Sequence, residues 1–262
     1  MCSSDLFLFW GLFASMILYP VYCNWVWGGG FLSQLGALGP KWGHGAIDFA
    51  GSGVVHAMGG VAAFWGAKVL GARIGKFDKD GNPRAIPGHH IPMAFLGTMV
   101  LLVGWMGFNG ASTFAATDFR FTVVIVNTIL AAAFGCLTTM FVMWKKYGKP
   151  DPSMTCNGLL AGLVAITAPC AFVAPWAAAL IGVVAGVLVV VGVVVVEQKF
   201  KVDDPVGAVA VHGVNGLWGL VALGLFADGT YGSGWNGVDG AVKGLFYGDA
   251  GQLWAQLASV VV

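Results

Sequence analysis

Two apolar stretches of the sequence, residues 48–60 and 204–216, share the same spacing of chemically distinctive residues. Each begins with an aspartate and has a glycine three positions later, a histidine eight positions later and a second glycine twelve positions later. The histidines are His56 and His212, and a charged group at the middle of a bilayer costs about 2.5–3.5 kcal/mol on insertion scales. Two histidines at matched positions indicate an internal duplication that builds a site near the middle of the membrane.

Two facing histidines would give such a site a defined chemistry. A neutral imidazole has one N–H donor and one lone pair, so two rings in contact can share a hydrogen bond and still present a polar edge to a narrow apolar channel. Such a channel suits a small neutral hydride or a single proton better than a large solute. Two other interpretations remain open, a pair of core histidines bonded to backbone carbonyls and a metal site. The metal site is disfavoured because the sequence has no HxxxH or HExxH motif and no obvious third ligand.

The composition indicates an integral membrane protein. Of the 262 residues, 58% are hydrophobic and only 10% are charged, whereas soluble domains carry about 25% charged residues. A net charge of +1 argues against nucleic-acid binding. No CxxC or Cys/His metal spacing is present, so we expect no metal and no cofactor, and we expect the five cysteines to behave as small hydrophobic residues: Cys2, Cys23, Cys136, Cys156 and Cys170.

The apolar segments predict an all-α, polytopic membrane helix bundle that forms a single partial domain over residues 1–262. A membrane-spanning helix needs about 20 residues. An eighth apolar segment, over about residues 250–262, is shorter than this, so we expect the chain to be an internal piece of a larger membrane protein, truncated at both ends. The seven segments that are long enough, or nearly so, are about 6–27, 46–70, 91–113, 121–144, 153–168, 172–196 and 205–227.

The basic residues predict the orientation of these segments. Ten of the thirteen Lys and Arg residues lie at or after the ends of the second, fourth and sixth segments, and three lie on the opposite side. The positive-inside rule places the larger group in the cytoplasm. The second and seventh segments then run in opposite directions. This predicts an inverted five-helix repeat, with His56 and His212 facing each other near the bilayer centre.

The aspartates of the two motifs lie where a helix should begin. We expect Asp48 and Asp204 to act as N-caps, which accept hydrogen bonds from free N–H groups and complement the helix dipole. Pro205 suits the first helical position after Asp204. For Asp48 we also expect an electrostatic role, because a buried carboxylate below the outer face would attract cations to the vestibule.

Three further residues on the outer side could bind a cation. Trp27 ends the first segment, and a tryptophan face attracts a desolvated cation by about 2 kcal/mol or more. Phe108 and Ser112 are four positions apart at the end of the third segment, so they share a helix face, and a serine hydroxyl can accept a hydrogen bond from a cation. The alternative for Trp27 is a residue of the interfacial aromatic belt.

Four strings of the sequence together resemble the ammonium transporter (Amt/Mep/Rh) family. They occur in the family's order and cover nearly all of the chain: VWGGG at 26–30, DFAGSGVVH at 48–56, GWMGFNGAS at 104–112 and VDDPVGAVAVHGV at 202–214. The resemblance implies a multi-pass plasma-membrane protein, an eleven-span homotrimer with one pore per subunit. This chain would cover the fourth span to the start of the eleventh. Trp27 favours the ammonium transporter branch over the Rh branch.

The resemblance also implies roles for the matching residues. His56 and His212 correspond to the family's twin-histidine pair in the pore. Trp27 and Ser112 match the outer ammonium recruitment site, Phe108 matches one phenylalanine of the aromatic gate, and Asp48 matches the carboxylate that supports recruitment. The implied partners are ammonium or ammonia, with methylammonium as an analogue, the lipid bilayer, two further copies of the chain and a cytoplasmic regulatory protein.

The expected function is therefore transmembrane transport of ammonium, and not an enzymatic reaction. One alternative is an ammonium-sensing membrane domain of a signalling protein. A second is a membrane-embedded enzyme, which would need a third catalytic group at mid-membrane, where no charged candidate appears. His44, His89 and His90 fall in predicted loops, and we expect them to be solvated.

Overall fold

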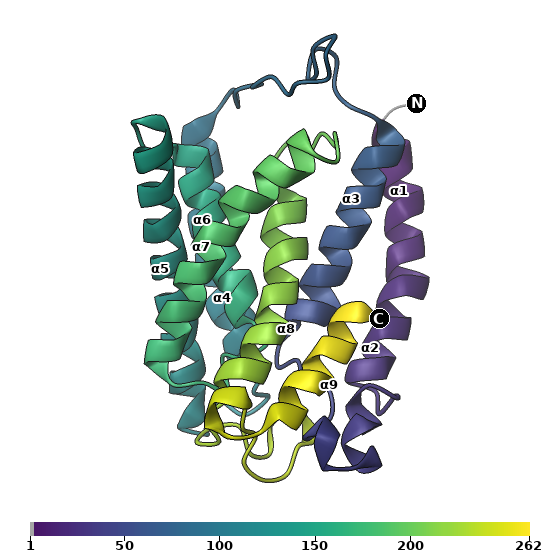
Figure 1. The fold of residues 1–262 in the computed structure, drawn as a ribbon, viewed down its shortest axis with the longest axis vertical. Coiled ribbons are helices and arrows are strands. Elements are labelled where there is room, and N and C mark those ends of the chain that lie inside the picture. The colour runs from purple at the N-terminus through teal and green to yellow at the C-terminus, as the bar shows by residue number, and fades with distance from the viewer. Residues whose placement is uncertain (1–2) are drawn as a thin grey trace.

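The structure is a computed structural model that describes residues 3–262, and within these residues the chain is a bundle of helices (Figure 1). Cys2 lies outside the described residues. In the described part of the chain, β-type pairing is limited to two isolated bridges, one between Phe77 and Pro83 and one between Asp228 and Lys243. The predicted all-α class is confirmed.

The helices follow the predicted apolar segments closely, with differences at their ends. Six stretches of the described chain have the length and composition to cross a membrane, and Pro152–Ile166, with 15 residues, is shorter. In chain order the elements are α1 Ser3–Phe13, η1 Ala14–Leu18, α2 Tyr19–Val26, η2 Ser33–Leu38, η3 Pro40–Trp42, η4 Ser52–Ala57, α3 Met58–Leu70, α4 Ile91–Ala111, α5 Arg120–Tyr147, α6 Pro152–Ile166, α7 Pro175–Gln198, η5 Val209–Val214, α8 Asn215–Phe226, η6 Trp235–Gly237, η7 Leu245–Tyr247 and α9 Ala250–Val261.

The short helix α6 lies in the interior of the bundle and continues into buried turns. It starts at an N-cap, Asp151, whose side chain accepts from the N–H of Met154, and residues 167–173 after it are buried turns. Asn127 of α5 donates from Nδ2 to the carbonyls of Cys170 and Val173. These two bonds satisfy carbonyls of the buried turns, so the chain can leave the helix inside the protein.

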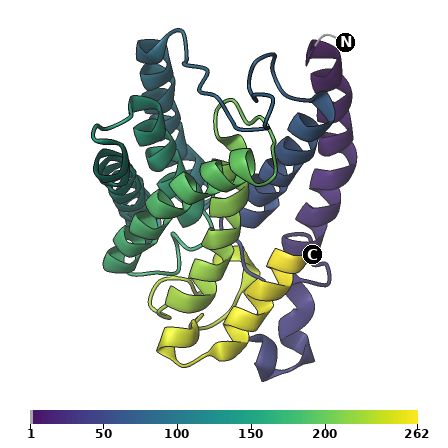
Figure 2. The same cartoon turned by 45° about the horizontal axis from the view of Figure 1, so that its top comes forward.

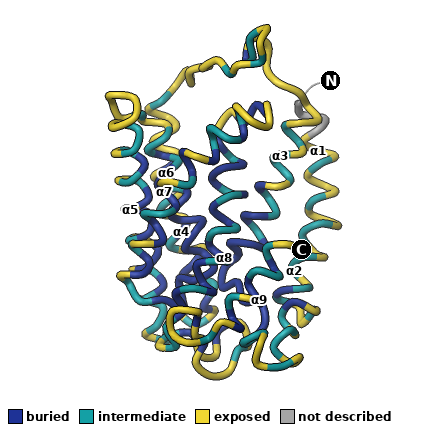
Figure 3. The backbone as a smooth tube through the Cα atoms, in the orientation of Figure 1, coloured by how far each residue is buried: buried dark blue, intermediate teal, exposed yellow. Residues whose placement is uncertain are grey.

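Buried residues concentrate along α6 and α8, in the middle of the molecule (Figure 3). The outward faces of other helices carry large apolar side chains, for example Phe9, which is 71% exposed, and Val103, which is 73% exposed. Such surfaces are typical of helices that face lipid or further helices, since soluble surfaces rarely hold large apolar patches.

One end of the bundle carries the connections that were predicted to be cytoplasmic (Figure 1). There Arg73 donates from its guanidinium to both carboxylate oxygens of Asp203, at 2.7 and 2.8 Å. Lys76 forms an ion pair with Glu197 at the end of α7. The connection after α3 is thereby fixed to the segment that enters η5.

The ion pair of Arg73 and Asp203 predicts a pH dependence. The guanidinium beside Asp203 holds the pKa of this carboxyl below its usual value, so its contribution to stability is present above the unfolded-state pKa of about 3.9 and is lost as the pH falls through the folded-state pKa. We expect Asp203→Asn to lower the melting temperature of the full-length protein at pH 7, and this difference to shrink below about pH 4. A difference that stays constant over this range would contradict the ion-pair explanation.

Candidate functional site

The imidazoles of His56 and His212 are in direct contact. His56 lies in the π-helical turn η4 and His212 in the π-helical turn η5. Their Nδ1 atoms are 3.2 Å apart, and their ring centroids are 5.2 Å apart with planes inclined by 26°. The predicted contact is confirmed. Because two like atoms share this hydrogen bond, one Nδ1 carries the proton and the other accepts it.

Each histidine follows the same local structure. Asp48 lies three residues before the N-cap Gly51, and its carboxylate accepts from four N–H groups, those of Gly51, Ser52, Gly53 and Val54, at 2.8–3.0 Å. Four backbone donors on one carboxylate fix the direction in which the helix leaves the loop.

The second repeat has an equivalent arrangement. Asp204 accepts from the N–H groups of Ala208 and Val209, at 2.9 and 2.7 Å. Gly51 and Gly207, which occupy matched positions, both have positive φ, 115° and 73°, where a side chain would be strained. Both aspartates therefore bind free N–H groups at the start of their helices. The prediction that they are the N-cap residues is wrong, because the N-caps are Gly51 and Ala208 and Pro205 lies in the turn before the helix.

The second glycine of each motif sits where the two helices cross. A Cβ atom on Gly60 would collide with the backbone of Gly213, and one on Gly216 would lie 2.6 Å from the backbone nitrogen of Ala57. Gly60 matches Gly216, and Ala57 matches Gly213, so the two contacts are exchanged by a pseudo-two-fold axis. The α3 and α8 helices also run in opposite directions (Figure 1), as an inverted repeat requires.

Aromatic rings from α4 pack against the histidine pair. Trp105 stacks on His56 with centroids 5.0 Å apart and planes inclined by 16°, and Phe108 lies 5.6 Å from the same ring. The indole N–H of Trp105 donates to Thr167 at 3.0 Å, which holds the ring in place. Sequence reasoning missed Trp105, although it lies three positions before Phe108 and therefore on the same helix face.

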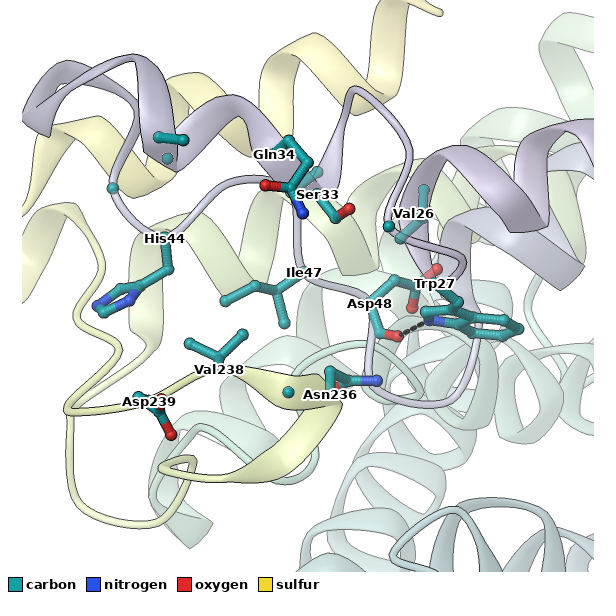
Figure 4. Close-up of a pocket in the computed structure, with 16 residues that line it drawn as sticks. Val26, Trp27, Ser33, Gln34, His44, Ile47, Asp48, Asn236, Val238 and Asp239 are labelled. Carbon is teal, nitrogen blue, oxygen red and sulfur yellow. Dashed lines mark hydrogen bonds between the residues drawn. The ribbon is translucent and has the colours of Figure 1, made fainter.

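Trp27 and Asp48 line a cavity of about 440 Å³ (Figure 4). The residues around it belong to the end of the bundle opposite the basic connections (Figure 1). The indole N–H of Trp27 donates to the backbone carbonyl of Asp48 at 2.6 Å. The carboxylate of Asp48 is committed to backbone N–H groups, and the residue is only 1% exposed. His44, predicted to be a solvated loop residue, also lines this cavity.

Ser112 lies at the C-cap of α4, apart from that cavity. Its hydroxyl donates to the carbonyl of Phe108 at 2.7 Å, which leaves its lone pairs free to accept. Neither Ser112 nor Phe108 lines the cavity beside Trp27, so the structure does not gather the predicted outer residues around a single cavity. His89 is exposed, as is His90, whose Nδ1 accepts from the N–H of Met93 as the N-cap of α4.

No metal centre is evident in residues 3–262. This part of the chain holds no group of three or more His, Cys, Asp or Glu residues able to bind a metal ion. The four cysteines it contains are free.

Comparison with known proteins gives a consistent result. The sequence profile of the Ammonium Transporter Family matches residues 2–262. The ammonium transporter Amt2 of Archaeoglobus fulgidus is 50% identical over 261 residues, which cover 98% of this chain and 55% of that protein.

Two solved structures are similar in fold and sequence. One described as a "Sensor Amt Protein" has a TM-score of 0.82 and 35% identity over 95% of this chain and 58% of that chain. Candida albicans Mep2 has a TM-score of 0.82 and 30% identity over 98% of this chain and 54% of that chain. The chain spans about half the length of these relatives. The profile match, the fold and the paired motifs together show that the chain belongs to the ammonium transporter family.

Proposed function

We propose that the protein transports ammonium or ammonia across the plasma membrane through a path lined by His56 and His212. The observation that carries the proposal is the Nδ1–Nδ1 hydrogen bond of 3.2 Å between the buried ring of His56 and the half-buried ring of His212, which come from opposed helices. Membership of a family of transporters supports it, and we assign no enzymatic reaction to the pair. The multi-pass helical architecture supports the location in a membrane.

The proposed sequence of events begins at the outer side. The indole face of Trp27 and the hydroxyl of Ser112 attract ammonium, and Asp48 acts mainly by fixing the backbone and the indole rather than by touching the cation. At Phe108 the ion loses its hydration shell and gives its proton to water on the outer side, since the apolar path beyond disfavours a charged solute. Ammonia then passes the histidine pair, whose free ring atoms offer a donor and a lone pair.

Uptake by the full-length protein tests this function. We expect cells that lack their own ammonium transporters to take up radiolabelled methylammonium in a saturable way when they express the protein. Replacing His212 with leucine removes the shared hydrogen bond while keeping an apolar side chain, and we expect uptake to fall by about tenfold or more. Equal uptake by cells with and without the protein would contradict the proposal.

Trp27 has a separate predicted effect. We expect Trp27→Leu to raise the KM for methylammonium by about tenfold, because a cation–π contact is lost, and to leave the fold intact. Trp27→Phe keeps an aromatic face and loses the indole N–H that bonds Asp48, so comparing the two variants separates cation binding from positioning. Equal KM values for wild type and Trp27→Leu would remove Trp27 from the binding site.

The assembly and its partners form part of the proposal. A homotrimer would cover some of the apolar faces exposed in a single chain, such as those of Phe9 and Val103, and lipid would cover the rest. The basic end of the bundle supports a cytoplasmic orientation and is the face that a regulatory protein would reach.

A second candidate function is sensing. It is favoured by the likeness to the structure described as a "Sensor Amt Protein". In that case the same membrane domain would report ammonium to a signalling domain elsewhere in the full-length protein. Saturable binding of methylammonium without uptake, together with a kinase or cyclase domain in the complete coding sequence, would favour the sensor.

A further inference from the structure

The last helix of the chain, α9, carries two fully buried glutamines on one face. Gln252 and Gln256 are one helical turn apart, and both are 0% exposed. A buried amide is costly unless its donor and acceptor groups are paired. Their partners therefore identify what the glutamines hold in place.

Gln256 pairs with both polar groups of Ile47. Its Oε1 accepts from the N–H of Ile47 at 2.8 Å, and its Nε2 donates to the carbonyl of Ile47 at 2.7 Å. Nε2 is also 3.3 Å from the carbonyl of Leu220 in α8. The amide of Gln256 thus gives Ile47 the hydrogen-bond donor and acceptor that a neighbouring strand gives to a residue in a sheet.

Gln252, four residues before Gln256, binds the backbone just before Ile47 in a similar way. Its Oε1 accepts from the N–H of His44 at 3.0 Å, and its Nε2 donates to the carbonyl of Gly45 at 2.8 Å. The segment 44–47 lies outside any helix, so without the glutamines these backbone groups would lose their hydrogen-bond partners. Helix α9 and this segment lie side by side at the cavity end of the bundle (Figure 2).

Two glycines allow the helix to approach this closely. A Cβ atom on Gly43, whose φ is 50°, would lie 2.8 Å from the Cα of Gln252, and one on Gly251 would collide with the carbonyl of Pro40. The position of the segment along α9 is therefore fixed by backbone contact as well as by hydrogen bonds.

The segment leads directly to the cavity beside Trp27. Ile47 is followed by Asp48, whose carbonyl accepts the indole N–H of Trp27 and whose carboxylate caps η4 (Figure 4). A shift of the segment would move this carbonyl and release the indole. We propose that Gln252 and Gln256 are positioning residues for cation capture, which hold segment 44–47 so that Asp48 orients the ring of Trp27.

This proposal rests on the transport function proposed above and adds α9 to its outer site. It differs from a general contribution to packing, because α9 has a further attachment. Tyr22 donates from its hydroxyl to the carbonyl of Ser259 at 2.9 Å. Loss of one glutamine amide should leave the helix docked and the segment displaced.

The test uses the full-length transporter and methylammonium uptake. Gln256→Met keeps the length of the side chain and removes its hydrogen bonds. We expect its KM to rise about tenfold, as in Trp27→Leu, while Vmax stays within about twofold of wild type. Thr139→Val is the matched control, because Thr139 is also 0% exposed and bonded to a carbonyl, that of Gly186 at 2.8 Å, between α5 and α7. We expect a wild-type KM for this control.

A double variant decides whether Gln256 acts through Trp27. In that case Gln256→Met raises KM no further in the Trp27→Leu background. Three results would overturn the proposal. They are full additivity of the two KM effects in the double variant, an unchanged KM in a folded Gln256→Met protein, and a fall in Vmax without a change in KM. If Gln256→Met does not fold, Gln256→Asn is used in its place, because it keeps the amide on a shorter side chain. The expected rise in KM and the results that would overturn the proposal are the same. Failure of the transport function itself would show differently, as absent uptake by wild type. Failure of the proposed role of Trp27 would show as an unchanged KM in Trp27→Leu.

Discussion

Replacement of Asp48 by asparagine is expected to abolish methylammonium uptake and to lower the stability of the full-length protein by about 2–5 kcal/mol. Both carboxylate oxygens are in use, each accepting from two backbone N–H groups. Asparagine replaces one oxygen with an NH₂ group, so two buried N–H groups lose their acceptor in either orientation of the amide. Uptake assays and melting of the purified protein check this expectation.

Asp151 provides the matched control for Asp48. It caps α6 through a single bond to the N–H of Met154, and asparagine is as good an N-cap as aspartate at such a position. Asp151→Asn should therefore leave uptake and melting temperature near wild type. Near-normal behaviour of Asp48→Asn would show that its four hydrogen bonds contribute little.

Replacement of Gly60 by alanine is expected to have a comparably large effect on uptake. The new Cβ atom would meet the backbone of Gly213 and His212, which cannot rotate away, so η5 must move from α3 and the two imidazoles must separate. Overpacking of this kind costs about 1–3 kcal/mol. We expect a stable but inactive protein, identified by uptake and by recovery of folded protein in detergent.

The neighbouring glycine supplies the control for this variant. A Cβ atom on Gly59 would have no atom within 4 Å, and alanine is a better helix former than glycine by about 1 kcal/mol. Gly59→Ala should keep its uptake. If Gly60→Ala transported as well as Gly59→Ala, the close crossing of the two helices would not be required for function.

The sequence predicts the centre of this site better than its surroundings. The apolar segments predict the helical bundle. The spacing from Asp48 to Gly60, repeated from Asp204 to Gly216 in the second and seventh of these segments, predicts the opposed helices and the contact of His56 with His212. A repeated motif carries this information because both copies must satisfy the same local geometry. The family assignment made from these motifs is confirmed by the profile match.

Other features depend on contacts between residues far apart in sequence. Gln256 and Ile47 are 209 positions apart, and nothing in the local pattern of α9 indicates that its glutamines hold an irregular segment. For the same reason the predicted segment 46–70 was too long at its start. Residues 46–51 are bound by side chains and by backbone carbonyls of distant segments, and η4 begins only at Ser52. The roles assigned to Trp27, Ser112 and Phe108 remain predictions.

The hydrogen bond between the two histidines gives the pair a direction. If one Nδ1 carries the shared proton, the Nε2 of that ring has a lone pair, and the Nε2 of the other ring carries a hydrogen. A neutral pair therefore presents an acceptor at one end and a donor at the other, although its backbone surroundings are nearly symmetric. Reversing this direction requires proton movement at both rings. A symmetric scaffold thus holds two equivalent but oppositely polarised arrangements, and a passing molecule meets one of them at a time.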